Sequence, residues 1–399
     1  MVNELRLNGH RIHPGSPLLR GRPILLSGPR TRAPADPTTG VAARSPTSIA
    51  VGLDKEPDSP ERDAFSMSTW KEPSQPHAGM EAESASAQTA LSASAEWVAP
   101  ERARREEELA ISERTARQFY AEELRFTANI SSRAVIDAFA TVPRECFVGP
   151  GPWRILSPMR MGGYWTTADA DPRHVYHDVL IALDEARGIN NGQPSLWAKL
   201  YDQLNLSTGA HVVHVGAGAG YYSAVLAEIV GRSGHVTAIE IDPDLAGRAR
   251  NNLISWPQAT VVVADGFAFH GDRPANAIVV NAGVTHVSMT WLDMLSVEHG
   301  RLLVPLSNSN GWGGFLLIER RAAETRRYSA QHVSPTGIIP CIGGRDPAAE
   351  ERLDAALARS RMTDVRSLRR APDEPDETCW LAGDGWWLST ASADGSQSS

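Results

Sequence analysis

The chain has 399 residues, of which 42% are hydrophobic and 22% are charged. Its 39 basic and 47 acidic residues leave a formal net charge of −8, so no overall positive field would attract nucleic acid or an acidic membrane surface. Its three cysteines form no CxxC pair and exclude a disulfide framework, which favours a reducing, cytoplasmic setting. No apolar run approaches the roughly 18 residues of a membrane span.

Residues 1–100 are rich in Pro, Ser, Ala, Gly, Arg and Thr and show no apolar periodicity. Such a composition buries too little apolar surface to offset the entropy of ordering, so a disordered leader is predicted. The alternatives are a docking tail and a translation start at Met67 or Met80. Residues 390–399 are predicted to be a disordered tail.

Order is expected from residue 101, where a charged helical stretch runs through Phe126. A second helix is predicted over residues 132–140, where apolar residues recur at helical spacing. Pro143 disfavours helix in the residue before it and so ends this stretch. The region up to about Gly188 is predicted to consist largely of loops.

From Gly209 onward, short apolar runs alternate with helical segments. Continuous Val and Ile runs indicate strands buried on both faces, and their alternation with helices indicates βαβ units. The fold class is therefore α/β, a doubly wound and mostly parallel Rossmann-like sheet, in one domain over residues 101–389. Strands are predicted at 211–215, 235–239, 260–263, 277–280, 301–304, 314–319, 338–346 and 386–388, and helices at 222–230, 245–253 and 348–360.

A glycine-rich loop follows the first strand of this sheet directly. Gly216, Gly218 and Gly220 are spaced as GxGxG and precede a helix. Glycines there permit positive φ and let a ligand approach the backbone, as in nucleotide sites. A dinucleotide loop has the pattern GxGxxG, and Tyr221 stands where its third glycine would be. NAD is therefore not expected, and the GxGxG spacing resembles class I S-adenosylmethionine-dependent methyltransferases.

Two acidic residues end the next two strands. Glu240 can accept hydrogen bonds from both ribose hydroxyls of such a cofactor, and Asp265, followed by Gly266, can accept one from the adenine amino group. Each feature alone has a structural explanation: an ordinary turn, a solvated strand end, or a helix N-cap before Phe267. Their order at successive strand ends favours the cofactor site.

The chain resembles the protein-L-isoaspartate O-methyltransferases over roughly residues 101–389. Both the fold and a carboxylate-methylating activity on proteins or peptides are implied by this resemblance. It rests on segments similar to the family's VPRE-x-FV, AYxD, SQP, GTGSGYQAAVLA and GGRLVxP, at residues 142–148, 175–178, 192–194, 216–227 and 300–305.

Two positions depart from the family. Gly192 stands where the family signature carries a serine associated with catalysis, and His214 replaces an acidic residue just ahead of the glycine loop. By resemblance, the residue at 214 would help to orient the methionine end of the cofactor. A neutral imidazole can donate a hydrogen bond but does not supply the same charge.

The missing hydroxyl has three neighbouring replacements: Asn190, Asn191 and Ser195. A carboxylate acceptor is already ionised at neutral pH, so positioning and desolvation matter more than a general base. Asn191 is the first choice, with Gly192 marking the catalytic position. An equally good explanation of Asn191 is a turn residue in an Asn-Asn-Gly sequence.

No metal site is expected. His174 and His177 lie near Asp171 and Asp178, but no further ligand pair has suitable spacing, so loop residues are the better interpretation. The tryptophans at 312, 380, 386 and 387 are expected to cover a sheet face.

Three functions remain open at this stage. The first is methylation of an isoaspartyl carboxylate on a protein or peptide by S-adenosyl-L-methionine. The second is the same fold acting on another peptide or a small molecule, and the third is a non-catalytic relative, suggested by Gly192 and His214 together.

Overall fold

The computed structural model describes residues 6–7, 10–11, 81–157, 159, 162–321 and 326–394. Its contacts divide the chain into two units, Met1–His77 and Ala78–Ser399. In the first, β1 (Arg6–Leu7) pairs antiparallel with β2 (His10–Arg11). All other described elements belong to the second. Most of the predicted leader, and residues 395–399 of the predicted tail, lie outside the described residues.

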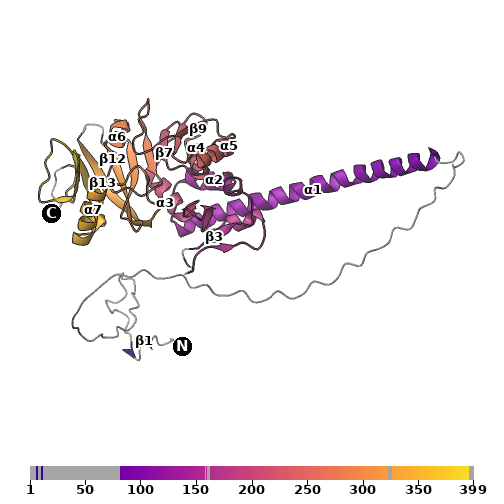
Figure 1. The fold of residues 1–399 in the computed structure, drawn as a ribbon, viewed down its shortest axis with the longest axis horizontal. Helices are drawn as coiled ribbons and strands as arrows, with labels where there is room; N and C mark the ends of the chain where they lie inside the picture. The colour runs from indigo at the N-terminus through magenta and orange to yellow at the C-terminus, as the bar shows by residue number, and fades with distance from the viewer. Residues whose placement is uncertain are drawn as a thin grey trace, which may run out of the picture. The chain divides into compact units, whose positions relative to one another are not determined.

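The first helix of the second unit, α1 (Glu81–Thr127), begins inside the segment that the sequence predicts to be disordered. Its early residues are rich in Ala, which has the highest helix propensity, and include several Glu. Residues 101–110 are exposed all round, whereas Tyr120, Ala121 and Leu124 near its end are buried. The C-terminal end of α1 lies beside α2 (Arg133–Thr141) (Figure 1). Among the described residues no helix combines the length and apolar character needed to cross a membrane.

The predicted parallel sheet is confirmed. The strands β7 (His211–Val215) and β10 (Ala277–Val280) contain predicted Val and Ile runs and are completely buried, as expected for central strands. The strand β9 (Ala259–Val263), at the edge of the sheet, is less buried than its apolar run predicts, and Val263 is 42% exposed. The parallel strands lie in the order β11 (Arg301–Ser307), β10, β7, β8 (His235–Glu240), β9 (Ala259–Val263).

The direction of winding reverses between β7 and β10. The chain moves from β7 outward through β8 to β9, and then returns to place β10 on the other side of β7. Loops that follow these two strands diverge there and leave a crevice at the carboxyl ends. The glycine loop after β7 therefore faces the loop that begins at Asn281.

Helices cover both faces of the sheet (Figure 1). One core packs beneath the end of α1 and the helices α2 (Arg133–Thr141), α3 (Pro194–Leu204) and α4 (Tyr221–Val230). The other contains residues of α6 (Met289–Met294) and α7 (Pro347–Arg359). The helix α5 (Pro243–Asn252) packs beside β8 and β9.

The sheet continues through antiparallel strands that the sequence predicted only in part. The predicted strand at 338–346 is wrong: apart from one bridge at Pro340 it is irregular, because its carbonyls and amides bond to the loop at 283–285. Three strands were missed, one of them with 11 residues. The missed strands are β13 (Arg327–Gly337), β14 (Ser367–Arg370) and β15 (Cys379–Gly383), whereas β12 (Trp312–Arg320) and β16 (Trp386–Ser389) contain predicted strands.

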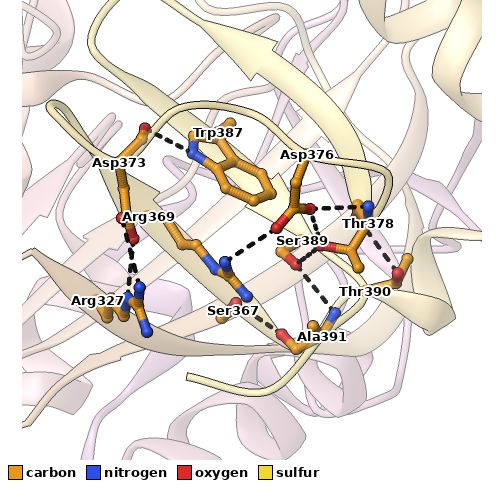
Figure 2. Close-up of polar contacts among 10 residues, drawn as sticks. All are labelled: Arg327, Ser367, Arg369, Asp373, Asp376, Thr378, Trp387, Ser389, Thr390 and Ala391. Carbon is orange, nitrogen blue, oxygen red and sulfur yellow. Dashed lines mark hydrogen bonds and ion pairs between the residues drawn. The ribbon is translucent and has the colours of Figure 1, made fainter. Parts of the chain in front are cut away.

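Arg369 is the centre of the contacts that hold these last strands together (Figure 2). Its guanidinium lies 4.7 Å from the ring centroid of Trp387 and 3.5 Å from a carboxylate oxygen of Asp376. Trp387 in turn donates to the carbonyl of Asp373, which pairs with Arg327. The amide of Thr390 donates to the carbonyl of Thr378, so the first residue of the predicted tail is hydrogen-bonded to the loop before β15 (Cys379–Gly383).

A small second sheet lies in the predicted loop region. Its strands are β4 (Trp165–Thr166), β3 (Arg154–Leu156), β5 (Leu180–Asp184) and β6 (Ile189–Asn190), all antiparallel. A short helix, η2 (Arg144–Phe147), and a second one, η3 (Pro172–Val175), flank it. Together β6 and α3 carry the acceptor-side residues of the sequence prediction.

Candidate active site

The glycine loop has the backbone that the sequence predicts. Gly216, Gly218 and Gly220 have φ of +76°, +57° and +94°, values that residues with a Cβ rarely adopt. A Cβ on Gly220 would approach Leu253 to 3.2 Å, and one on Gly216 would lie 3.5 Å from Asn281. The loop thus brings bare backbone to the crevice and starts α4 behind it.

Glu240 links β8 to this loop. Its Oε2 accepts a 2.7 Å hydrogen bond from the amide of Gly218, and its Oε1 accepts one of 3.0 Å from Asp242. Although the residue is only 7% exposed, it borders the crevice. Each carboxylate oxygen retains a second lone pair, so the group can still accept hydrogen bonds from a ligand diol.

Asp265 and Gly266 lie beside Glu240 at the end of β9. The Oδ1 of Asp265 accepts a 2.9 Å bond from the amide of Phe267 and caps a turn, with no helix following in the described residues there. Gly343 lies directly against this carboxylate, since a Cβ on it would be 2.2 Å from both oxygens. Gly266 is required for packing, because a Cβ there would approach Val215 to 2.4 Å.

Two clefts open on the crevice. The cleft that contains the predicted cofactor residues, here named the cofactor cleft, has a volume of about 170 Å³ and is lined by the glycine loop, Glu240, Asp265 and residues 339–343. Burial raises the pKa of the Cys341 thiol in its wall, which keeps that group neutral. The acceptor cleft, of about 600 Å³, runs between residues 190–199 and the ends of β12 and β13. The clefts share Asn190, Gly216, Gly218, Asn281 and Ile339.

Arg144 fixes the acceptor loop, residues 190–193, from below. This fully buried guanidinium donates to Oδ1 of Asn191 at 3.0 Å and to the carbonyl of Gly192 at 3.2 Å. It also donates to the carbonyls of residues 175, 177 and 179. Because a guanidinium only donates, the amide oxygen of Asn191 must face Arg144. Asn191 lines the acceptor cleft, and its NH₂ group makes no hydrogen bond to a described residue.

The other two candidates to replace the missing hydroxyl, Asn190 and Ser195, already form hydrogen bonds with protein groups. Ser195 donates from Oγ to Asp178 at 2.7 Å, and its amide donates to the same carboxylate. The hydroxyl proton of Ser195 is therefore already used in a hydrogen bond that holds the start of α3. Asn190 accepts the amide of Gly192 at 2.8 Å and so holds the turn itself.

Gly192 has φ of +54°, and its missing side chain has no space. A Cβ there would lie 2.6 Å from Nε1 of Trp197 and 3.2 Å from Cε2 of Tyr222. The indole of Trp197 thus occupies the volume of a side chain at 192. Sequence reasoning missed Trp197; the signal was a large aromatic five residues after an unexpected glycine.

His214 lies behind the glycine loop and borders neither cleft. It is completely buried, and its Nδ1 lies 2.8 Å from Oγ of Ser223. Burial lowers its pKa to about 4, although the side chain of Asn281 acts to raise the pKa. The ring is therefore neutral at pH 7. Its Nε2 and the amide oxygen of Asn281 make no normal hydrogen bond to described residues. Any effect of His214 on a ligand would pass through Asn281.

The remaining candidates have other roles. His174 pairs with Asp169 at 2.8 Å on the surface, and no cluster of metal-ligating side chains occurs within the described ranges. The tryptophans at 380, 386 and 387 are buried, as expected. Trp312 is 68% exposed and borders the acceptor cleft, so the expectation that it covers the sheet is wrong.

The cofactor cleft fits S-adenosyl-L-methionine on two structural grounds. A Cβ on Gly216 would narrow the space beside its glycine loop. Because glycine has none, room remains for a ligand against the backbone. Glu240 presents a carboxylate with free lone pairs to the same space. A diol is suited to that acceptor, and no phosphate-binding third glycine is present.

Comparison with known proteins gives one consistent result. Residues 116–337 match the family described as protein-L-isoaspartate(D-aspartate) O-methyltransferase. A protein-L-isoaspartate O-methyltransferase of Rhodopseudomonas palustris (strain BisB5) is 32% identical over 218 residues, 54% of this chain and 88% of the relative. That of Methanothermobacter thermautotrophicus is 29% identical over 217 residues, 54% of this chain and 89% of the relative.

A solved structure named protein-L-isoaspartate O-methyltransferase is 20% identical, with a TM-score of 0.46, over 67% of this chain and 87% of its own. The family match contains the glycine loop, Glu240, Asp265 and the acceptor loop, and it ends with β13.

Proposed function

Because the chain belongs to the protein-L-isoaspartate(D-aspartate) O-methyltransferase family, whose methyl donor is S-adenosyl-L-methionine, we propose that it methylates isoaspartyl carboxylates in proteins or peptides and that Asn191 orients the acceptor. One observation carries this proposal: the two clefts meet at Gly216, Gly218 and Asn281, at the point where the sheet reverses. A donor held by the glycine loop and a carboxylate in the acceptor cleft would be adjacent there.

The charge of the acceptor cleft supports an anionic acceptor. Lys199 is the charged side chain among its described lining residues, and no carboxylate borders it. A carboxylate that enters this cleft meets amide and aromatic groups and one cation. Desolvation by these walls would strengthen its interactions with the donors around it.

When bound, S-adenosyl-L-methionine supplies an electrophilic methyl group on its sulfonium, and the carboxylate oxygen displaces the sulfur without a proton transfer. The chain therefore needs to position and desolvate its acceptor. Asn191 is suited to this task because Arg144 holds its amide oxygen and thereby fixes its NH₂ end as a donor. Glu240, Asp265 and the glycines at 216, 218, 220 and 266 would hold the cofactor, with His214 acting indirectly.

The test is methyl transfer from labelled S-adenosyl-L-methionine to an isoaspartyl peptide, read as base-labile ester. Asn191→Ala should lower kcat/KM by about 10 to 100-fold, the effect of one hydrogen bond to a charged group, with cofactor binding unchanged. Asn191→Asp keeps an acceptor for Arg144 but places a negative charge beside the substrate, so it should lose more activity while unfolding at the same temperature.

An Asn191→Ala protein with unchanged turnover would end the assignment of Asn191. A wild-type protein that binds S-adenosyl-L-methionine but makes no ester on an isoaspartyl peptide would refute the proposed acceptor. Another methylated product would then indicate a different acceptor of the same fold, and no product a non-catalytic relative.

A further inference from the structure

Trp197 occupies the place of the side chain that this chain lacks at position 192. A Cβ on Gly192 would lie 2.6 Å from its Nε1 and 3.1 Å from Cδ1, so the polar edge of the indole faces that point. The positive φ of Gly192 is compatible with this arrangement, because glycine adopts it without strain. The glycine and the tryptophan therefore form one structural unit.

The orientation of the indole is fixed by packing. Trp197 is only 4% exposed, and its ring lies 5.4 Å from that of Tyr222 and 5.5 Å from that of Phe315. Tyr222 donates to the carbonyl of Gly192 at 3.3 Å, and burial raises its pKa well above the usual value, so this contact persists at neutral pH. Trp197 and Tyr222 both line the acceptor cleft.

The indole nitrogen is a donor with no acceptor within the described part of the chain. Four other indole nitrogens, those of Trp153, Trp256, Trp291 and Trp387, each donate to a protein oxygen. That of Trp380 has no partner but is sealed in the core, away from either cleft. Trp197 differs from all of these because it borders a cavity large enough for a substrate.

We propose that the indole N–H of Trp197 replaces the missing hydroxyl and donates a hydrogen bond to the acceptor carboxylate, beside the amide of Asn191. This inference rests on the proposed function. An indole N–H donates and never accepts, so the pair should favour a carboxylate over a hydroxyl or amine acceptor. A serine, which also accepts, would discriminate less.

The first test is Trp197→Phe, which keeps the aromatic packing and removes the donor. We expect kcat/KM for an isoaspartyl peptide to fall about 10 to 100-fold, while the Kd of S-adenosyl-L-methionine measured by calorimetry stays the same. The matched control is Trp256→Phe, another buried indole, whose nitrogen donates to Glu228 away from both clefts. It should retain wild-type kcat/KM.

The second test restores a hydroxyl at position 192 and removes the indole at position 197. Gly192→Ser alone should lose activity, because its Cβ clashes with the indole. Gly192→Ser combined with Trp197→Val frees the space and restores a donor, so it should exceed Trp197→Val alone by about tenfold, the worth of a recovered hydrogen bond. A merely structural role of Trp197 predicts that the double variant is no better than the single one.

A third measurement reports the contact directly. The Nε1–H resonance of Trp197, assigned by its loss in Trp197→Phe, should shift when isoaspartyl peptide is added to ¹⁵N-tryptophan-labelled protein. An active wild type with unchanged kcat/KM in Trp197→Phe and an unmoved resonance would overturn this inference alone. An inactive wild type would instead overturn the proposed function, and the inference with it.

Discussion

The two sides of the crevice are built in different ways. The cofactor side is mostly backbone: three glycines with positive φ, and a carboxylate 22 residues later that holds the amide of Gly218. The acceptor side is mostly side chains from separate elements, with Arg144 and Trp197 converging on residues 191 and 192. A backbone site tolerates little change in sequence, whereas a side-chain site can supply the same donor from a different residue.

Removal of Arg144 should break the acceptor side most severely. Arg144→Met leaves buried carbonyls and the amide of Asn191 without their donor, so the free energy of unfolding should fall by about 4 kcal/mol. Urea denaturation measures this. Arg133→Met, on the exposed surface of α2, should have no measurable effect. A loss for Arg144→Met no larger than that of Arg133→Met would mean that Arg144 does not support the loop.

The buried imidazole behind the glycine loop should make stability depend on pH. His214 has a pKa of about 4 in the folded chain against an ordinary value of 6.5, so the unfolded chain binds the extra proton between these values. The contribution of the neutral, buried imidazole to the free energy of unfolding is fully present above pH 6.5. It is lost as the pH falls towards 4, by about 3 kcal/mol in total. His214→Gln should show a correspondingly flatter dependence of unfolding free energy in this window; parallel curves would contradict the assignment.

Glu240 tests the cofactor side alone. Glu240→Ala should raise the Kd of S-adenosyl-L-methionine about 100-fold, because it would remove the acceptor proposed for the ribose and does remove the acceptor of the Gly218 amide. Calorimetry measures this, with Glu240→Gln as the milder variant. Asn191→Ala should leave the same Kd unchanged. Equal effects of both variants would show that the two sides are not separable.

The smallest effect is expected at Lys199. Lys199→Met removes the cation from the rim of the acceptor cleft and should lower kcat/KM for an anionic peptide by about twofold to fivefold, as for a partly exposed ion pair. The difference should shrink at high salt because of screening. A neutral acceptor peptide should show no difference, and a salt-independent loss would indicate a packing defect instead.

Much of the fold follows from sequence pattern. Val and Ile runs specify the buried parallel strands, and Pro143 lies just beyond the end of α2. The failures have tertiary causes. Residues 338–346 have a strand-like composition, but Gly283 and Thr285 take up their backbone hydrogen bonds. The 11-residue strand β13 was missed because it has no apolar run: its buried positions are separated by more exposed ones, and two of them, Ser334 and Thr336, are polar.

The sequence by itself predicted the glycine loop and Glu240, which are proposed to hold the cofactor, because positive φ at closely spaced glycines and an acidic residue at the next strand end are properties of short segments. It also revealed that position 192 lacks a hydroxyl. Only the tertiary structure decided what replaces it. Arg144 lies 47 residues before Asn191 in the chain and fixes which end of that amide can donate. The fold of α3 against Tyr222 and Phe315 aims the indole of Trp197 at the vacant position. Side-chain direction depends on packing between distant segments, which no local pattern records.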